Sequence, residues 1–293
     1  MATPQDGDPA LAHMRGKMCL ITGGTGGIGK ETALGLAQQG AAVVIVGRDA
    51  ARAQAAVADI KARSGNDAVS AMIADLSSQA EVRRLAREFT DAHDRLDVLV
   101  NNVGAVYGKR MLTVDGIEMT LAVNHLAYFL LTNLLLPLLK RSAPARIVSV
   151  SSEAQRAGRI DFDDLQRARR YRAFEAYSQS KLANVVWTYE LALRLEGSGV
   201  TANCVHPGAV ATGFGRNNSG LWRVLFRVFA PFMRTPERGA ATSIYLAASP
   251  EVEGISGQYF SDRKPIRSNS QSYDPEVARR LWLASEELTA GSA

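Results

Sequence analysis

The stretch Thr22-Gly-Gly-Thr-Gly-Gly-Ile-Gly29 follows a short apolar run at 18–22 and opens a segment with helical spacing at 28–39. Glycines at positions 23, 27 and 29 allow a tight turn and a close approach of the backbone to a diphosphate. The helix N-terminus would direct backbone N–H groups at such an anion. A glycine cluster alone is weak evidence, but the order strand, turn, helix predicts a dinucleotide-binding turn. Its expected contacts are Gly23, Thr25, Gly26, Gly27, Ile28 and Gly29.

The same alternation of apolar run and helical segment continues along the chain. The predicted strands are 18–22, 41–46, 69–73, 96–101, 145–150, 200–205 and 258–261, and the predicted helices are 28–39, 50–63, 79–93, 115–140, 174–195, 236–248 and a last one from Pro275. Nearly continuous apolar strands indicate a parallel sheet with helices on both faces. We therefore expect one doubly wound α/β (Rossmann) domain over 16–293, a disordered tail at 1–15, and a substrate-covering segment at about 207–235.

The end of the second predicted strand reads Val46-Gly47-Arg48-Asp49 and bears on the choice of cofactor. An acid near this position holds the ribose 2′-OH of NAD, whereas an arginine accommodates the 2′-phosphate of NADP. Asp49 stands at about the right distance for that acid, but it is also well placed as the N-cap of the next helix. Arg48 offers a forked donor that suits a phosphate. The pattern favours NADP(H) and leaves NAD(H) open.

Composition excludes several classes of function. The chain has 293 residues, 46% of them apolar, and a net charge of +5 without a concentrated basic stripe, so nucleic acid is not an expected partner. Cys19 and Cys204 lie in apolar stretches with no partner at metal-ligand spacing, and we expect neither a disulfide nor a metal site. No signal peptide and no apolar run of roughly 20 residues are evident, which predicts a cytoplasmic protein without a stable membrane anchor. The bulky segment 221–233 fits a cover over the substrate, a peripheral membrane contact or a subunit contact.

A tyrosine and a lysine begin the helix that follows the fifth predicted strand, in Tyr177-Ser-Gln-Ser-Lys181. Side chains four residues apart share one helix face. A nearby ammonium would lower the pKa of the tyrosine, whose ordinary value near 10 makes it a poor acid–base group at neutral pH. Ser152 ends the fifth predicted strand, where open α/β sheets place their ligands. His125 and His206 we expect to be packed, hydrogen-bonded side chains.

Together these motifs resemble the short-chain dehydrogenase/reductase family from Lys17 to about Ser261. The motifs that carry the resemblance, in the family's order, are Thr22-Gly23-x3-Gly27-x-Gly29, Asp75-Leu76, Asn101-Asn102-Val103-Gly104, Asn124, Ser152, Tyr177-x3-Lys181 and Pro207-Gly208-x-Val210-x-Thr212. Val103 departs from the family's usual alanine, a change we expect to be tolerated with slight repacking.

The resemblance implies a role for each matching residue. Tyr177 would be the general acid–base, Lys181 would lower its pKa and bind the nicotinamide ribose, and Ser152 would polarise the substrate oxygen. Asn124 would anchor a water that relays protons to Lys181. The remaining cofactor contacts would be Asp75 and Leu76 at the adenine, Asn102, Val103 and Gly104 along the cleft, and Pro207, Gly208, Val210 and Thr212 at the nicotinamide end.

A narrower set of motifs is similar to the retinol dehydrogenase and WW-domain oxidoreductase-like branch. These are Asn124-His-Leu-Ala-Tyr-Phe-Leu-Leu-Thr132, Tyr177-Ser-Gln-Ser-Lys-Leu-Ala-Asn184 and Ser256-Gly-Gln-Tyr-Phe-Ser-Asp262. The likeness implies reduction of hydrophobic ketones or aldehydes, or oxidation of the matching alcohols, on retinoid-like, polycyclic or polyketide substrates. The sequence leaves open whether the protein forms a homo-oligomer through the two long predicted helices at 115–140 and 174–195. The alternative is a regulatory protein that binds NADP(H) without turnover.

Overall fold

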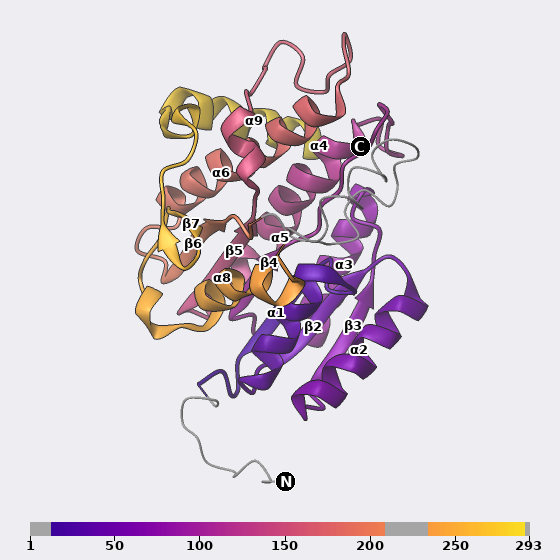
Figure 1. Ribbon diagram of the computed structural model, residues 1–293, viewed down its shortest axis with the longest axis vertical. Coiled ribbons are helices and arrows are strands. Elements are labelled where there is room, and N and C mark those ends of the chain that lie inside the picture. The colour runs from indigo at the N-terminus through magenta and orange to yellow at the C-terminus, as the bar shows by residue number, and fades with distance from the viewer. Residues whose placement is uncertain (1–12, 209–233, 291–293) are drawn as a thin grey trace.

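A computed structural model describes residues 13–208 and 234–290, which form a single α/β domain around one sheet (Figure 1). The strand order is β3-β2-β1-β4-β5-β6-β7-β8, and every neighbouring pair is parallel except β7 with β8. The strands are β1 (Met18–Thr22), β2 (Ala42–Gly47), β3 (Val69–Ile73), β4 (Val98–Asn101), β5 (Ala145–Val150), β6 (Val200–Val205), β7 (Tyr259–Ser261) and β8 (Lys264–Pro265). The predicted doubly wound fold is confirmed.

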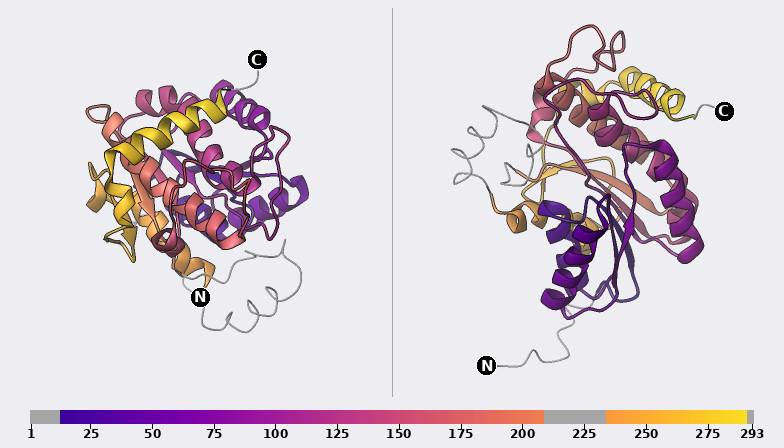
Figure 2. Two further views of the ribbon diagram at one scale, coloured as in Figure 1. Left: turned by 90° about the horizontal axis from the view of Figure 1, so that it is seen from above. Right: turned by 90° about the vertical axis from the view of Figure 1, so that its right-hand side faces the viewer.

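Two layers of helices cover the sheet, because successive strand residues point to opposite faces (Figure 2). Cys19 and Ile21 of β1 pack with α1 (Gly27–Gln38), α2 (Ala50–Ser64) and α8 (Pro236–Ala248) on one side. Leu20 faces the other side, where the covering helices are α3 (Gln79–Ala92), α5 (Ala127–Arg141) and α6 (Ala173–Arg194). The C-terminal helix α9 (Pro275–Thr289), yellow in Figure 2, packs on α6.

The order of the strands locates the ligand crevice. Chain order reverses at β1, which has β2 on one side and β4 on the other. In open α/β sheets, ligands bind beyond the carboxyl ends of the strands at such a switch point. The glycine turn leaves β1 there, and Asn102 leaves β4 there.

One predicted helix begins later than expected and is irregular. The segment predicted at 115–140 begins only at Met119 and is made of α4 (Met119–Leu121), a π-helical turn (Ala122–Leu126) and α5. Residues before it form a turn with a bridge between Leu112 and Glu118. The start predicted at Asp115 is wrong because the Glu118 carboxylate accepts from the amides of Thr120 and Leu121, both at 2.8 Å, and so caps the helix there.

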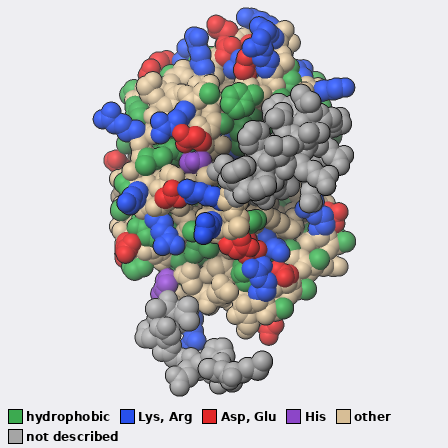
Figure 3. All heavy atoms as spheres, in the orientation of Figure 1, with side chains coloured by type: hydrophobic (Ala, Val, Ile, Leu, Met, Phe, Trp, Pro, Cys, Tyr) green, Lys and Arg blue, Asp and Glu red, His purple; other side chains and the backbone are tan. Residues whose placement is uncertain are grey.

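The helical stretch Met119–Arg141 has the length and apolarity of a membrane span, which the sequence reading did not anticipate. Its most apolar window is 78% buried inside the protein, against α3, α6 and the sheet, as in the core helix of a globular fold. On the face drawn in Figure 3, Lys and Arg side chains are interspersed with Asp and Glu.

Near the N-terminus, Met14 is buried and its amide donates to the Gln39 carbonyl, so packing begins by residue 14.

Candidate active site

The glycine turn forms a cradle that side chains would fill. A Cβ on Gly23 would lie 3.0 Å from Asn102 Nδ2 and 3.0 Å from the Val103 Cα, and one on Gly29 would collide with the Gly23 carbonyl. Gly23 and Gly27 also have positive φ angles of 67° and 54°. The N-cap Gly26 brings no side chain to the first amides of α1. Backbone N–H groups at a helix start that lack a capping side chain suit a diphosphate.

Asn102 joins the two strands that flank the switch point. Its side-chain amide donates to the Thr22 carbonyl at 2.8 Å, and its backbone amide donates to Thr22 Oγ1 at 2.9 Å. The Val103 amide donates to the same hydroxyl at 3.1 Å. Thr22 therefore shapes the cleft together with the predicted Asn102 and Val103. We did not assign it a role, although its place at the head of the glycine motif was a usable signal.

Two arginines follow β2, Arg48 directly after the strand and Arg52 in the first turn of α2. Arg48 is exposed, and Asp49 accepts from the Arg52 amide at 2.9 Å as the predicted N-cap of α2. The Arg52 guanidinium lies 3.8 Å from the position of a Cβ on Gly26, so it also reaches the turn. Arg52 could not be predicted as a contact, because a position inside the next helix gives no hint that its side chain folds back.

The predicted adenine contacts take different environments. Asp75 is exposed, and its carboxylate accepts from the amide and hydroxyl of Ser77 at 3.0 Å and 2.8 Å. Leu76 is buried and its side chain belongs to the core beneath α3 and α5. The side chain of Leu76 is therefore mainly part of the core.

Lys181 and Tyr177 come together on α6 below the carboxyl end of β5. The Lys181 side chain is buried, its Nζ donates to the Val150 carbonyl at 3.0 Å, and it lies 5.9 Å from the centre of the Tyr177 ring. Burial lowers the pKa of Lys181 to about 8. Burial raises the pKa of Tyr177 to about 12, and a hydrogen bond with Ser152 offsets only part of that rise. The pKa of Tyr177 is therefore raised by its surroundings, and not lowered by the neighbouring ammonium as we expected from the spacing.

The predicted Asn124 lies in the π-helical turn and grips the loop after β4. Its Oδ1 accepts from the Ala105 amide at 2.8 Å, and its Nδ2 donates to the Ala105 carbonyl and to Ser180 Oγ, both at 3.0 Å. A Cβ on Gly104 would lie 3.2 Å from Lys181 Nζ and 3.6 Å from Asn124 Oδ1. The absence of a side chain at Gly104 thus lets the amide and the ammonium flank the same short backbone segment.

Two further residues hold this arrangement, and we did not predict them. The Tyr128 hydroxyl donates to the Val103 carbonyl at 2.7 Å, and its ring centre lies 5.8 Å from Lys181 Nζ. Ser151 Oγ donates to the Lys181 carbonyl at 2.7 Å. Tyr128 follows Asn124 by one helical turn, a spacing that could have indicated a shared face.

The nicotinamide end of the predicted site is described only in part. Pro207 and Gly208 are described, whereas Val210, Thr212 and most of the segment 207–235 lie outside the described residues. His206 Nδ1 accepts from the amides of Glu153 and Gly208 at 3.1 Å and 3.3 Å, which confirms a packed, hydrogen-bonded histidine.

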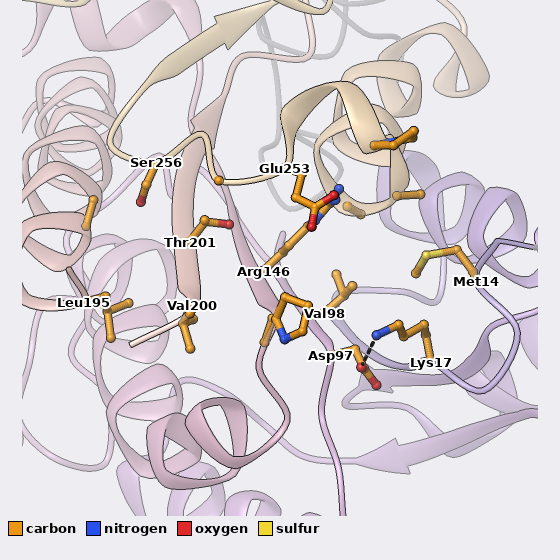
Figure 4. Close-up of a pocket in the computed structure, with 18 of the residues that line it drawn as sticks. Met14, Lys17, Asp97, Val98, Arg146, Leu195, Val200, Thr201, Glu253 and Ser256 are labelled. Carbon is orange, nitrogen blue, oxygen red and sulfur yellow. Dashed lines mark hydrogen bonds and ion pairs between the residues drawn. The ribbon is translucent and has the colours of Figure 1, made fainter. Parts of the chain in front are cut away.

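A groove of about 630 Å³ lies at the opposite, amino-terminal edge of the sheet (Figure 4). Three of its charged side chains already make contacts within the fold. Lys17 pairs with Asp97 at 3.0 Å, and Arg146 donates to the carbonyls of Leu246 and Ser249 at the end of α8. Because it lies at the edge of the sheet opposite to Ser152, Tyr177 and Lys181, we do not assign the active site to this groove.

Comparison with known proteins agrees with this geometry. The sequence model described as short chain dehydrogenase matches residues 17–220. The chain is 47% identical to retinol dehydrogenase 14 of Homo sapiens over 298 residues, which cover 96% of this chain and 88% of the relative. It is 45% identical to retinol dehydrogenase 12 of Mus musculus, over 93% of this chain and 86% of the relative.

Solved structures give the same family resemblance. An uncharacterised protein from Mycobacterium paratuberculosis superposes with a TM-score of 0.77 at 33% identity, covering 96% of both chains. The RhlG/NADP active-site complex of Pseudomonas aeruginosa superposes with a TM-score of 0.69 at 31% identity, covering 86% of this chain and 96% of that one.

Proposed function

This chain belongs to the short-chain dehydrogenase family, and from that premise we propose that it is an NADP(H)-dependent enzyme that interconverts a hydrophobic ketone or aldehyde and the corresponding alcohol. The observation that carries the proposal is the convergence of Tyr177, Ser152 and Lys181 at the carboxyl edge of the sheet. The glycine cradle opens at the same edge, at the switch point. A reacting carbonyl and a dinucleotide can therefore meet over one surface.

The preference for NADP(H) rests on the charges at the end of β2. Arg48 is exposed there, and the Arg52 guanidinium lies beside Gly26 of the glycine turn. Asp49, the acid that could have held a ribose 2′-OH, accepts from the start of α2 instead. Two cations and an engaged carboxylate favour a 2′-phosphate over a free hydroxyl.

The chain's own residues would position the reactants and move the proton. The cofactor, when bound, supplies or accepts the hydride at its nicotinamide. In reduction, the Tyr177 hydroxyl donates its proton to the substrate oxygen, and the Ser152 hydroxyl, which bonds with Tyr177, holds that oxygen. Lys181, whose pKa burial lowers to about 8, supplies donors for the ribose and positive charge that stabilises the phenolate left behind.

The substrate class follows from the relatives. Relatives that are 43% to 47% identical to this chain carry the name retinol dehydrogenase, which denotes a long, apolar alcohol. We therefore infer a hydrophobic carbonyl or alcohol, with retinoids, polycyclic ketones and polyketide ketones as candidates. A screen of NADPH oxidation over hydrophobic aldehydes and polycyclic ketones tests the inference. Turnover of short polar carbonyls alone would contradict it.

The competing hypothesis is a protein that binds NADP(H) as a sensor and catalyses nothing. The retained set of Asn124, Ser152, Tyr177 and Lys181 favours an enzyme, because a sensor does not need a proton donor. Tyr177→Phe separates the two hypotheses. In an enzyme this substitution lowers kcat by at least a hundredfold. The Kd for NADPH, measured by fluorescence, stays within a few-fold of the wild-type value. A wild-type protein that binds NADPH and turns over no carbonyl in the screen would favour the sensor.

A further inference from the structure

His125 lies inside the protein beside Asn124, in the π-helical turn Ala122–Leu126. None of its surface is exposed, and burial lowers its pKa to about 4, so the ring is neutral near pH 7. A neutral imidazole has one N–H donor and one acceptor nitrogen. Its two neighbours must therefore be one acceptor and one donor.

The hydrogen bonds around His125 settle which is which. Asn184 Nδ2 donates to the Asn124 carbonyl at 2.8 Å, so the amide oxygen of Asn184 is the atom that faces His125 Nδ1 at 3.2 Å. An amide oxygen can only accept, and His125 Nδ1 must carry the proton. His125 Nε2 is then the acceptor of the pair at 2.9 Å, and the single Ser285 hydroxyl proton is shared between this nitrogen and the Leu281 carbonyl, which lies 2.8 Å away on the same helix. The donors run in one direction, from α9 to the carbonyl of Asn124.

This chain of donors ends where the π-helical turn departs from an α-helix. The Ala127 amide bonds to the Ala122 carbonyl, one residue further back than in an α-helix. The Asn124 carbonyl receives the side chain of Asn184 from the neighbouring helix. Insertion of a side chain into the helical ladder is a recognised cause of such irregular turns. Asn184 therefore helps to hold the turn that carries Asn124.

The position of that turn is passed on to the ammonium of Lys181. The Asn124 side chain holds both backbone polar groups of Ala105, at 2.8 Å and 3.0 Å. Gly104, the residue before Ala105, lies so close to Lys181 Nζ that a Cβ would come within 3.2 Å of it. A shift of the turn would therefore move the backbone against which Lys181 is packed.

We propose that His125 and Ser285 are positioning residues, through which α9 sets the place of Asn124 and, through Ala105, the surroundings of Lys181. The proposal rests on the proposed function only for its kinetic readout. A polar network that merely stabilises the core would lower stability when broken and leave the active site unchanged. The two roles therefore separate in experiments that read Ala105 and catalysis independently of global stability.

The main test compares Ser285→Ala with Thr289→Val. Both variants remove a buried hydroxyl from α9, one helical turn apart, but Thr289 Oγ1 donates to the Ser285 carbonyl and not to His125. Amide hydrogen exchange at Ala105 reports directly on the hydrogen bond from this amide to Asn124 Oδ1. We expect exchange at Ala105 to become about fivefold faster in Ser285→Ala, the factor that one lost hydrogen bond corresponds to. In Thr289→Val it should follow global stability alone.

Kinetics supply the second readout. Ser285→Ala should lower kcat with NADPH by about tenfold, because small displacements of catalytic groups have large effects on rate, and Thr289→Val should leave kcat within twofold. Equal losses in both variants, or unchanged exchange at Ala105, would overturn the proposal. If the wild-type protein turns over no carbonyl, the proposed function fails, and exchange at Ala105 still decides the positioning role.

The tautomer of His125 is an independent check on the wild-type protein. The chain has four histidines, and a His125→Gln spectrum identifies the signals of this one in ¹⁵N NMR. We expect a proton on Nδ1 and nitrogen shifts that do not change between pH 6 and 8, as the pKa of about 4 requires. A proton on Nε2 would reverse the direction of the chain of donors and contradict the proposal.

Discussion

Lys181 and Tyr177 leave the same face of α6, and the lysine Nζ lies 5.9 Å from the centre of the tyrosine ring. The two groups are tuned in opposite directions by the same burial, which lowers the pKa of the lysine to about 8 and raises that of the tyrosine to about 12. At neutral pH the tyrosine is thus a protonated donor, and the lysine is close to losing its charge.

Lys181→Met should stabilise the ligand-free protein at neutral pH and abolish turnover. Folding lowers the pKa of Lys181 from an ordinary 10.5 to about 8, so between these values the unfolded chain binds the extra proton. Wild-type stability should therefore gain a rising contribution as pH increases from 8 to 10.5. The methionine carries no charge, so it avoids the cost of burying an ammonium. It should therefore be up to about 3 kcal/mol more stable than the wild type at pH 7 and lack this pH dependence. Urea unfolding of both proteins from pH 7 to 10 checks this, and parallel pH dependences would contradict it.

Arg48→Ala and Arg52→Ala should each weaken the use of NADPH and spare that of NADH. A lost charge-assisted hydrogen bond to a 2′-phosphate corresponds to roughly a tenfold to hundredfold rise in KM. The KM for NADH in the same variant serves as the internal control, because that cofactor lacks the phosphate. Wild-type protein that uses NADH as well as NADPH, with neither variant changing the ratio, would show that the assignment of NADP(H) is wrong.

Gly104→Ala should reduce catalysis more than it reduces stability. A Cβ there would lie 3.2 Å from Lys181 Nζ, a tight contact that makes the lysine end shift by a few tenths of an ångström, and 3.6 Å from Asn124 Oδ1, which is an ordinary contact. The lysine end is flexible, so the fold should survive while kcat falls by about tenfold. The midpoint of thermal unfolding, measured beside kcat and the KM for NADPH, distinguishes the effects. A loss of stability with kcat unchanged would contradict this reading.

Much of the framework could be predicted because its signals are local. The strands at 69–73, 145–150 and 200–205 and the helix at 236–248 coincide with the observed elements, since apolar runs end at turn residues and Thr235 caps the helix with its side chain. The short β8 was missed because two residues, one of them proline, carry no periodicity. The π-helical turn was missed because Asn184, 60 residues away, holds it.

In the site, too, the features that depend on local sequence could be predicted and those that depend on distant contacts could not. Spacing placed Tyr177 and Lys181 on one face, and the glycine motif placed the cradle, because both depend on neighbours in the chain. The direction of the tyrosine pKa could not be predicted, because burial is a property of the folded protein and not of the spacing. The same holds for Arg52, whose guanidinium returns to Gly26, and for the contact of Ser285 with His125.

The position of α9 leads to a prediction about assembly. Trp282 of α9 packs edge-on against Phe129 of α5 at 5.0 Å between ring centres, and the Arg194 guanidinium of α6 stacks on it at 3.9 Å. The helix α9 thus lies on the two long helices through which a homo-oligomer was considered. We expect a monomer in solution, measured by light scattering after gel filtration.

Trp282→Ala tests the role of α9 as that cover. Truncation of a largely buried tryptophan should cost about 3 kcal/mol of unfolding free energy and loosen α9 from α5 and α6. The exposed apolar surface should then make the variant associate as its concentration rises, while the wild type stays monomeric. Leu283→Ala is the matched control, because that side chain of the same helix is 49% exposed. A wild-type dimer that Trp282→Ala leaves intact would place the subunit contact elsewhere and refute the prediction.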